Sequence, residues 1–456
     1  MEIFESLQKV EKGPIYNEKK FDLKLASMTK GLIKEYDLKF SPEEVVPSDN
    51  SIGDDVFEAG KTLILELGGF CPDTDRIIEF SEDELKEALR NTPNQIILGE
   101  GKDAVVHKKR GIEDKKPPVI IGGSVGMLTS EEIYIEHIMS YAKERVIDAL
   151  CCDTPATIRG ERYKSGSPME IYVAKQEIAW IREALRRVGR PGLHIGAPCS
   201  AVTAQSLNSV ASADGGLRKT DSHGVAILNE LKIPYDSLSK AVHCIGYGGI
   251  IRNLYSPLIG GYAGPPEGVA IVSIAGILLG ILMFKAVSTT IDPHHIKYPG
   301  TAHRPGIWVE NVVGQAISRN LEALVTNNIF TAAGPCTKMV LYEAAAVAIG
   351  ATVSGLSMGP AVGTADTKYL DFSTGLETRL MGEVARGTAN SSLKRVEANE
   401  IVLNLLKRYE SQITSAPLGK KFQECYDLKT VTPSKEWNGI YLEGKREIGD
   451  LGVTFD

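Results

Sequence analysis

The stretch RPGLHIGAPCSAVTAQ, residues 190–205, combines a short apolar run with a loop that carries a thiol. Residues 193–195 have the pattern of a buried strand, and Cys199 lies in the loop of small residues that follows it. A nucleophilic cysteine needs a lowered pKa and a partner base. His194 and His223 are candidates for that base, but sequence distance places neither beside the sulfur. The alternative, which we favour, is that Cys199 is a small, partly buried residue that contributes to packing and has no chemical role.

A second segment with chemical potential is KTDSHGVAILNELK, residues 219–232, which we expect to form a short helix. Asp221 or Ser222 would cap that helix, so Asp221 is expected to be structural. Glu230 is a carboxylate among apolar neighbours near the end of the segment. Such a group is either solvated on a helix surface or perturbed in a functional site, and both readings stay open.

The segment HHIKYPGTAHRP, residues 294–305, gathers several cationic or titratable side chains: His294, His295, Lys297, Tyr298, His303 and Arg304. A metal site would need further ligands from other elements. Strand alternation would place His294 on one face, with His295 and Lys297 on the other. We keep a substrate or anion contact as a hypothesis for this segment, whose individual roles the sequence leaves open.

These residues need a scaffold, and residues 116–375 predict one by alternating short β-rich runs with amphipathic helices. The candidate strands are residues 119–123, 146–152, 193–196, 240–246, 294–299, 328–333 and 351–359, with one more near 257–261. Such alternation indicates a parallel sheet with right-handed crossovers. Eight strands favour an α/β fold of the (β/α)8 TIM-barrel type, and a GxGxxG motif after the first strand is missing.

Helical segments are expected to flank this barrel on both sides. Residues 1–115 predict an N-terminal helical extension rich in charge, in which Ser81 and Glu84 form a capping signature. Residues 376–456 predict a C-terminal helical segment that packs on the barrel or on a neighbouring subunit.

Composition narrows the function classes. The chain has 456 residues and a formal net charge of -7, which argues against nucleic acid as the main partner. Its seven cysteines lack CxxC or Cys/His spacing, so we expect no zinc site and a reduced, cytoplasmic location. The N-terminus lacks an apolar, signal-like core.

One apolar run raises the question of a membrane span. Residues 268–284, GVAIVSIAGILLGILMF, are uncharged and lie between Glu267 and Lys285. The run falls at the short limit for a span, and it contains three glycines and a serine. We therefore expect a helix buried on all sides in a protein without membrane contact.

Several segments together resemble one family, the monomethylamine:corrinoid methyltransferases of methanogens. The matching runs are DTDRIIEFSEDEL, LGEGKDAVVHKKR, TDSHGVAILNELKI, IGGYAG, AAGPCTKM, GLETRLMGEVAR and SAPLGKKFQECYDLKTVTP. They lie in order from about residue 74 to residue 433. The resemblance implies a (β/α)8 barrel, a homo-oligomer, and methyl transfer to the Co(I) corrinoid of a partner protein, with no cofactor held tightly by this chain.

The chain departs from this family at its defining residue. The family carries pyrrolysine in the segment that matches GAPCSAVTAQ, and our alignment places that position on Val202. By the same resemblance, a carboxylate residue of the family aligns near Leu254. A glutamine and a tyrosine of the family align with Asn328 and Phe330. Of the polar set around pyrrolysine, Glu230 remains.

These changes bear on the methyl donor. Without an imine, the pocket cannot activate a primary amine by addition, so we expect monomethylamine not to be a substrate. A quaternary ammonium leaves as a neutral tertiary amine and needs no such activation. An apolar and aromatic pocket formed by Val202, Leu254 and Phe330 suits such a cation, with Glu230 as the catalytic counter-charge. Asn328 is expected to join them as a substrate-binding residue.

The leading hypothesis is therefore a pyrrolysine-free, corrinoid-dependent methyltransferase that demethylates a small methylated amine, with a corrinoid protein as its partner. The alternative is an inactive barrel that still binds the corrinoid protein as a regulatory or scaffold subunit. A third possibility is an unrelated lyase or hydrolase that uses Cys199.

Overall fold

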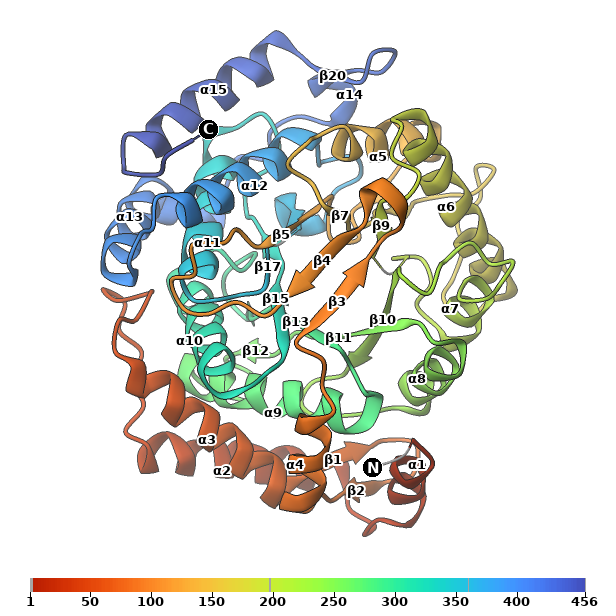
Figure 1. Cartoon of the computed structure of the whole chain (residues 1–456), viewed down its shortest axis with the longest axis vertical. Helices are drawn as coiled ribbons and strands as arrows, with labels where there is room; N and C mark the ends of the chain where they lie inside the picture. The colour runs from red at the N-terminus through yellow and green to blue at the C-terminus, as the bar shows by residue number, and fades with distance from the viewer. Residues whose placement is uncertain (1–2, 197, 360, 456) are drawn as a thin grey trace.

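The computed structural model describes residues 3–196, 198–359 and 361–455, and its centre is an eight-stranded sheet closed into a barrel (Figure 1). Every pair of neighbouring strands that forms a ladder is parallel, in the spatial order β10-β11-β13-β15-β17-β5-β7-β9. The strands are β5 (Val119–Gly122), β7 (Ala149–Leu150), β9 (His194–Ile195), β10 (Ser222–Ile227), β11 (Ile250–Tyr255), β13 (Ser288–Ile291), β15 (Leu324–Asn327) and β17 (Met358–Gly359).

Side chains connect β9 and β10, the two ends of this strand order. The backbone N–H of Ile195 donates to the Asp221 carboxylate at 2.9 Å. The His194 ring hydrogen-bonds to the Thr220 carbonyl at 2.7 Å and to the Ser222 hydroxyl at 3.0 Å. These contacts close the ring, and the expected (β/α)8 barrel is confirmed.

One helix follows each barrel strand. They are α5 (Tyr134–Ala142), α6 (Pro168–Arg187), α7 (Ala204–Val210), α8 (Tyr235–Tyr247), α9 (Pro266–Phe284), α10 (Arg304–Asn320), α11 (Lys338–Val353) and α12 (Gly375–Asn390). Helix α12 packs against β5 and β17 and so completes the ring. The segment after residue 375 thus holds the eighth barrel helix, followed by α13 (Arg395–Tyr409), α14 (Phe422–Cys425) and α15 (Lys435–Gly449).

The fourth barrel strand differs from the expectation. Residues 240–246 lie in α8, where Leu238, Ala241 and Cys244 are buried at helical spacing. The strand is instead β10, inside the segment that we expected to be helical. Alternation explains β10: Val225 and Ile227 pack in the core between strand and helices, and Gly224 and Ala226, which alternate with them, face the interior.

For four other expected strands, the predicted range either begins after the barrel strand has ended or is much longer than the strand itself. Residues 257–261 and 294–299 contain only β12 (Leu258–Ile259) and β14 (His294–His295), which pair with each other outside the main sheet. Likewise, β16 (Ile329–Phe330) pairs with β18 (Val362–Gly363), and β6 (Leu128–Thr129) pairs with β8 (Thr154–Pro155). Each short pair continues the direction of two neighbouring barrel strands. Residues 351–359 are mostly the end of α11, and only Met358–Gly359 form a strand.

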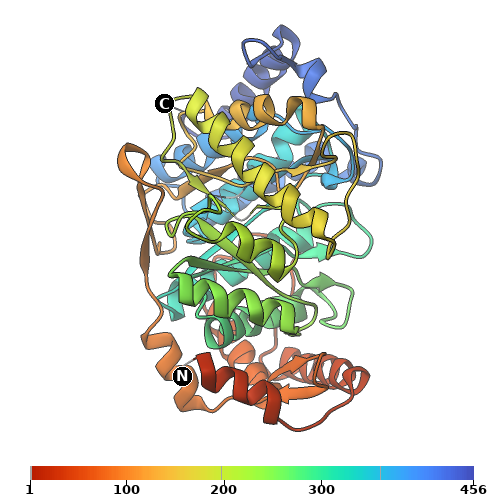
Figure 2. The same ribbon diagram turned by 90° about the vertical axis from the view of Figure 1, so that its right-hand side faces the viewer.

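The helices of the N-terminal extension lie at one end of the long axis and α15 at the other (Figure 2). Its helices are α1 (Ile3–Lys12), α2 (Glu18–Glu35), α3 (Asn50–Leu67) and α4 (Glu82–Arg90), with a small hairpin of β1 (Gly69–Cys71) and β2 (Arg76–Ile78). The expected capping box at the start of α4 is confirmed, because Ser81 and Glu84 bond reciprocally.

The extension also contains a β-hairpin that the helical expectation missed. It consists of β3 (Gln95–Leu98) and β4 (Val105–Lys108) and crosses the view of the barrel in Figure 1. Leu98 packs with Val119 and Ile121 of the first barrel strand. The backbone of the hairpin loop bonds to Gly192 and Thr220, which precede β9 and β10. The hairpin therefore covers the N-terminal end of the barrel, and the opposite end is the mouth.

Helix α9 contains the apolar run, and the expectation of a core helix is confirmed. It is long and apolar enough to cross a membrane, but 94% of its most apolar window is buried inside the fold. It packs between the barrel strands and α3, with α10 beside it. The approach of α3 is so close that a Cβ on Gly60 would lie 2.4 Å from the Ile274 side chain. A helix enclosed on all sides has no polar face to present.

Candidate active site

A carboxylate and an amide meet at the mouth of the barrel. Asp292 directly follows β13, and Asn328 directly follows β15. The backbone N–H and the side-chain amide of Asn328 donate to the Asp292 carboxylate at 2.9 and 3.2 Å. The Ser256 hydroxyl donates to the same carboxylate at 3.4 Å. Burial raises the pKa of Asp292 above its usual value. This group is a buried acid that ionises reluctantly.

Glu230 lies at the same end of the barrel, in the loop after β10 and not at a helix end. Only 2% of the residue is exposed. The Tyr255 hydroxyl donates to its carboxylate at 3.1 Å, and the backbone N–H of Leu258 donates at 3.5 Å. Burial raises the pKa of Glu230 to about 7, although both hydrogen bonds oppose this shift. Glu230 can therefore hold a cation or exchange a proton near neutral pH.

One contact ties the loop of Glu230 to the Asp292 group. The Asn229 side chain donates to the Ser256 carbonyl at 2.7 Å. Leu254, two residues before Ser256, is on the inward side of β11 because Asn253 and Tyr255 contact α9 on the outward side. The structure thus brings Glu230, Leu254 and Asn328 to the same end of the barrel.

Phe330 adds an aromatic ring to the mouth. It belongs to β16, and its ring centroid lies 4.7 Å from that of His294 in β14. The backbone N–H of Phe330 bonds to the Thr301 hydroxyl at 3.2 Å. His294 therefore lies at the mouth, in contact with a residue that the sequence had singled out separately.

Val202 lies at the outer rim. It comes well after the end of β9, next to the N-cap of α7, and 53% of it is exposed. Its carbonyl accepts a hydrogen bond from Lys240 of α8, which pairs with Asp236 at 2.8 Å. The residue that directly follows β9 is Gly196, which presents no side chain to the mouth.

The cysteine of this loop has the features of a packed thiol. The Cys199 sulfur donates to the Cys152 carbonyl at 3.0 Å, and its backbone N–H donates to Glu177 at 3.1 Å. A hydrogen bond with Cys151, together with burial, raises the pKa of Cys199 well above its usual value. A thiol in this state is a poor nucleophile.

Other candidate residues named from the sequence form contacts that stabilise the fold. Asp221 precedes β10 and pairs with Arg182, so it is part of the barrel closure and not a helix cap. Arg304 pairs with Glu410 at 2.7 Å. The His295 ring lies 5.3 Å from that of His303, away from Phe330. Within the described ranges no cluster of three or more His, Cys, Asp or Glu side chains has metal-binding geometry.

Asp292, Tyr255 and Arg252, which lie on or beside β11 and β13, were not among the residues predicted from the sequence. The available signal was STTIDP, residues 288–293, in which an alternating strand ends on an acid before proline. The expected strand at 294–299 placed the strand end too late, so this acid was not considered.

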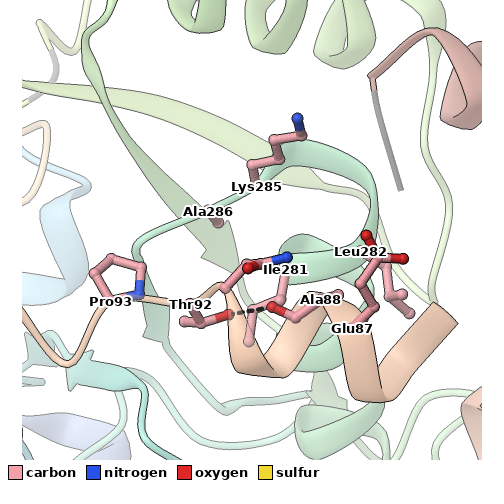
Figure 3. Close-up of a pocket in the computed structure, with 9 residues that line it drawn as sticks. Glu87, Ala88, Thr92, Pro93, Ile281, Leu282, Lys285 and Ala286 are labelled. Atoms are coloured by element: carbon pink, nitrogen blue, oxygen red, sulfur yellow. Dashed lines mark hydrogen bonds between the residues drawn. The ribbon is translucent and has the colours of Figure 1, made fainter. Parts of the chain in front are cut away.

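A pocket at the other end of the barrel is separate from this site. It measures about 320 Å³ and lies between α4 and the last turn of α9 (Figure 3). Glu87, Ala88, Thr92, Ile281 and Lys285 are among its lining residues. Since the end of α9 leads into the start of β13, the pocket lies at the N-terminal end of the barrel.

Comparison with known proteins settles the family. The family model described as monomethylamine methyltransferase MtmB matches residues 1–453. This chain belongs to the MtmB family. It is 38% identical over 433 residues to monomethylamine methyltransferase MtmB1 of Methanosarcina barkeri, which covers 95% of this chain and 94% of that protein. It is 37% identical to MtmB of Methanosarcina mazei over the same shares of both chains.

Solved structures agree with the family assignment. The crystal structure of the Methanosarcina barkeri MtmB matches with a TM-score of 0.95 and 36% identity, over 99% of this chain and 98% of that one. The crystal structure of a hydroxylamine complex of MtmB matches equally well. The resemblance inferred from the sequence motifs is therefore confirmed, and this MtmB-family chain is an enzyme of the corrinoid-dependent methyltransferase type.

Proposed function

We propose that this protein transfers a methyl group from a small methylated amine, quaternary and not monomethylamine, to the Co(I) corrinoid of a partner protein. Two facts together carry the proposal. The chain belongs to the MtmB family, and its sequence consists of standard amino acids only, without pyrrolysine. Whether Val202 or Gly196 occupies the pyrrolysine position, neither side chain can form an adduct with an amine.

The residues at the mouth support a cationic donor. The Glu230 carboxylate supplies one negative charge in a buried setting, where a charge interaction is stronger than in water. Phe330 offers an aromatic ring, and a ring face attracts a quaternary ammonium. Leu254 supplies apolar surface. We assign Glu230 the catalytic role and assign Leu254, Asn328 and Phe330 to substrate binding, with Val202 at the rim.

For a quaternary donor the protein does not need to form a covalent adduct. The Co(I) corrinoid supplies the nucleophile that takes the methyl carbon, while the nitrogen leaves with the electron pair of the C–N bond as a neutral tertiary amine. The chain's own residues hold the donor in line and exclude water, which is the contribution of orientation. No proton transfer is required for a quaternary donor.

The rim of the mouth fits a protein partner that presents a large, mostly apolar group. Loops that follow the barrel strands expose several large apolar side chains: Leu128, Val202, Leu228, Tyr262, Ile296 and Tyr369. Clusters of this kind mark interaction sites on soluble proteins. We propose that a corrinoid protein docks here and supplies the corrinoid.

The test combines the purified protein, a Co(I) corrinoid protein and a series of methylated amines. The change in corrinoid absorbance measures the methylation of cobalt. We expect methylation from a quaternary ammonium and none from monomethylamine. Methylation from monomethylamine would contradict the proposal. Binding of the corrinoid protein without transfer from any donor would favour the inactive scaffold instead.

We also propose a soluble, cytoplasmic homo-oligomer. All seven cysteines are free thiols, and the apolar helix α9 is covered by the fold. Light scattering should give a mass above that of one chain, in protein that stays in the supernatant without detergent. A monomer or a membrane-bound fraction would contradict this.

A further inference from the structure

Arg252 is directed into the interior of the barrel. On β11, Asn253 and Tyr255 face α9, and Ile251 packs in the core between strand and helices. Alternation therefore turns Ile250, Arg252 and Leu254 inward. Ile250 packs against the apolar cluster at the hairpin end, and Leu254 is at the mouth. Arg252 occupies the layer between them.

The Arg252 side chain is largely buried, and its Nε atom has no hydrogen-bond partner. Only 6% of the residue is exposed. Across residues 3–196, 198–359 and 361–455, no carboxylate lies within ion-pair distance of it. Its register neighbours, Gly224 on β10 and Ser288 on β13, are small, which leaves the long side chain room inside the barrel.

The titratable groups near Arg252 form no ion pair with it in the described part of the chain. They are His107, His194, Cys151 and Asp292. Burial lowers the pKa of His107 to about 3 and that of His194 to about 4, so both rings are neutral. The Asp292 carboxylate accepts its hydrogen bonds from Asn328 and Ser256, and in the described residues it forms no ion pair with Arg252. An unpaired charge in this position is costly, and a ligand anion would remove the cost.

We propose that Arg252 binds a carboxylate of the methyl donor, so that the donor is a zwitterion with a methylated ammonium group and an acid group. The inference rests on the proposed function, since it names the substrate class of that same site. A planar guanidinium matches a carboxylate with two parallel hydrogen bonds.

The position of Arg252 also gives the donor a direction. The carboxylate is anchored one layer below Leu254, and the methylated nitrogen points outward toward Glu230 and Phe330. The methyl groups then face the mouth, where a docked corrinoid can reach them. The register partner of Leu254 on β13 is Thr290, whose buried hydroxyl also lacks a partner and can donate to the ligand carboxylate.

The experiment measures binding by calorimetry on the whole purified protein, without a corrinoid protein. The probes are trimethylammonium carboxylates with spacers of increasing length, tetramethylammonium, 3,3-dimethylbutanoate and bicarbonate. We expect at least one zwitterion to bind tenfold or more tightly than tetramethylammonium. Arg252→Met should abolish that preference and leave tetramethylammonium binding unchanged, and Arg252→Lys should retain part of it.

A matched control and a stability readout separate binding from folding. Arg386→Met, which removes an arginine paired with Asp148 outside the barrel, should change no binding constant. Arg252→Met should melt at a higher temperature than the natural protein, because it removes an unpaired buried charge. A lower melting temperature, with zwitterion binding unchanged, would show a structural arginine and overturn the inference.

The remaining outcomes distinguish this inference from the proposed function. Methyl transfer from tetramethylammonium without any preference for zwitterions would uphold the function and overturn the role of Arg252. Zwitterion binding that depends on Arg252, without methyl transfer, would uphold the binding site and overturn the function. Equal, Arg252-dependent binding of bicarbonate or 3,3-dimethylbutanoate would show a general anion site and overturn the donor assignment.

Discussion

Glu230 places a carboxylate in apolar surroundings and keeps it titratable near neutral pH, and this has a measurable effect on stability. Its pKa is raised to about 7 in the folded protein, from an ordinary value of 4.5. Between these two pH values the folded state binds the extra proton, so ionisation works against folding as the pH rises.

The replacement Glu230→Gln should therefore stabilise the protein at high pH. Relative to the natural protein, we expect a gain at pH 8 on the order of 2–3 kcal/mol beyond any difference at pH 4.5, since one pKa unit corresponds to about 1.4 kcal/mol. Urea unfolding at both pH values measures it. A difference that is independent of pH would show that the carboxylate is not perturbed by burial.

The same replacement should impair function. If Glu230 holds a cationic donor, loss of a close charge in a desolvated site costs on the order of 2–5 kcal/mol, so kcat/KM should fall at least tenfold. Cys199→Ser should be nearly silent, because the thiol only packs. Both variants are assayed side by side on a donor found by the screen. An inactive Cys199→Ser with an active Glu230→Gln would support a cysteine nucleophile instead.

At the scale of elements, the contact between α9 and β11 positions Glu230. Tyr255, which donates to Glu230, packs its ring over Gly276 of α9, where a Cβ would lie 2.4 Å from the ring. The glycine is thus required for the close approach of the helix to the strand, and through Tyr255 it controls the carboxylate.

We expect Gly276→Ala to destabilise the protein by about 1–3 kcal/mol, because overpacking forces the tyrosine to move. Gly31→Ala, at an exposed position of α2, is the control, since nothing lies within 4 Å of a Cβ built there. That change should be neutral or stabilising by up to about 1 kcal/mol. Denaturant unfolding of both variants measures the difference. Equal stabilities would contradict the packing argument.

At the scale of the whole molecule, Arg110 links the N-terminal extension to the barrel by hydrogen bonds. It is 4% exposed. Its guanidinium donates to the carbonyls of Thr352, in the last turn of α11, and Leu356, just after that helix. It also donates to the carbonyls of Asp114 and Lys116 in the connecting segment, and each of the four distances is 2.9 Å. One side chain thus satisfies four backbone acceptors where the extension joins the barrel.

Arg110→Met should cost about 3 kcal/mol or more, since it leaves buried carbonyls without donors. Limited proteolysis should then cut the connecting segment, residues 108–118, faster than in the natural protein. Arg145→Met, at an exposed arginine, should change stability by less than about 0.5 kcal/mol. Unchanged cleavage in Arg110→Met would indicate that the extension is held by its apolar contacts alone.

Local patterns were sufficient for the class of fold and for several elements. Strand and helix alternation predicted the (β/α)8 barrel, the Ser81 and Glu84 pair predicted the start of α4, and the uniform apolar run predicted a core helix. These features depend on residues close together in sequence, where periodicity and capping act. The family followed from the sequence as well, because its motifs are spread along nearly the whole chain.

The tertiary structure decided what depends on partners distant in sequence. Barrel strands as short as His194–Ile195 exist only through pairing, so their bounds could not be read locally, and β10 was mistaken for a helix. The register of β11, β13 and β15 brings Asp292 and Asn328 together and turns Arg252 inward. Closure of the barrel places Val202 at the rim. Side chains converge only once register and closure are set, and neither is encoded within a single segment.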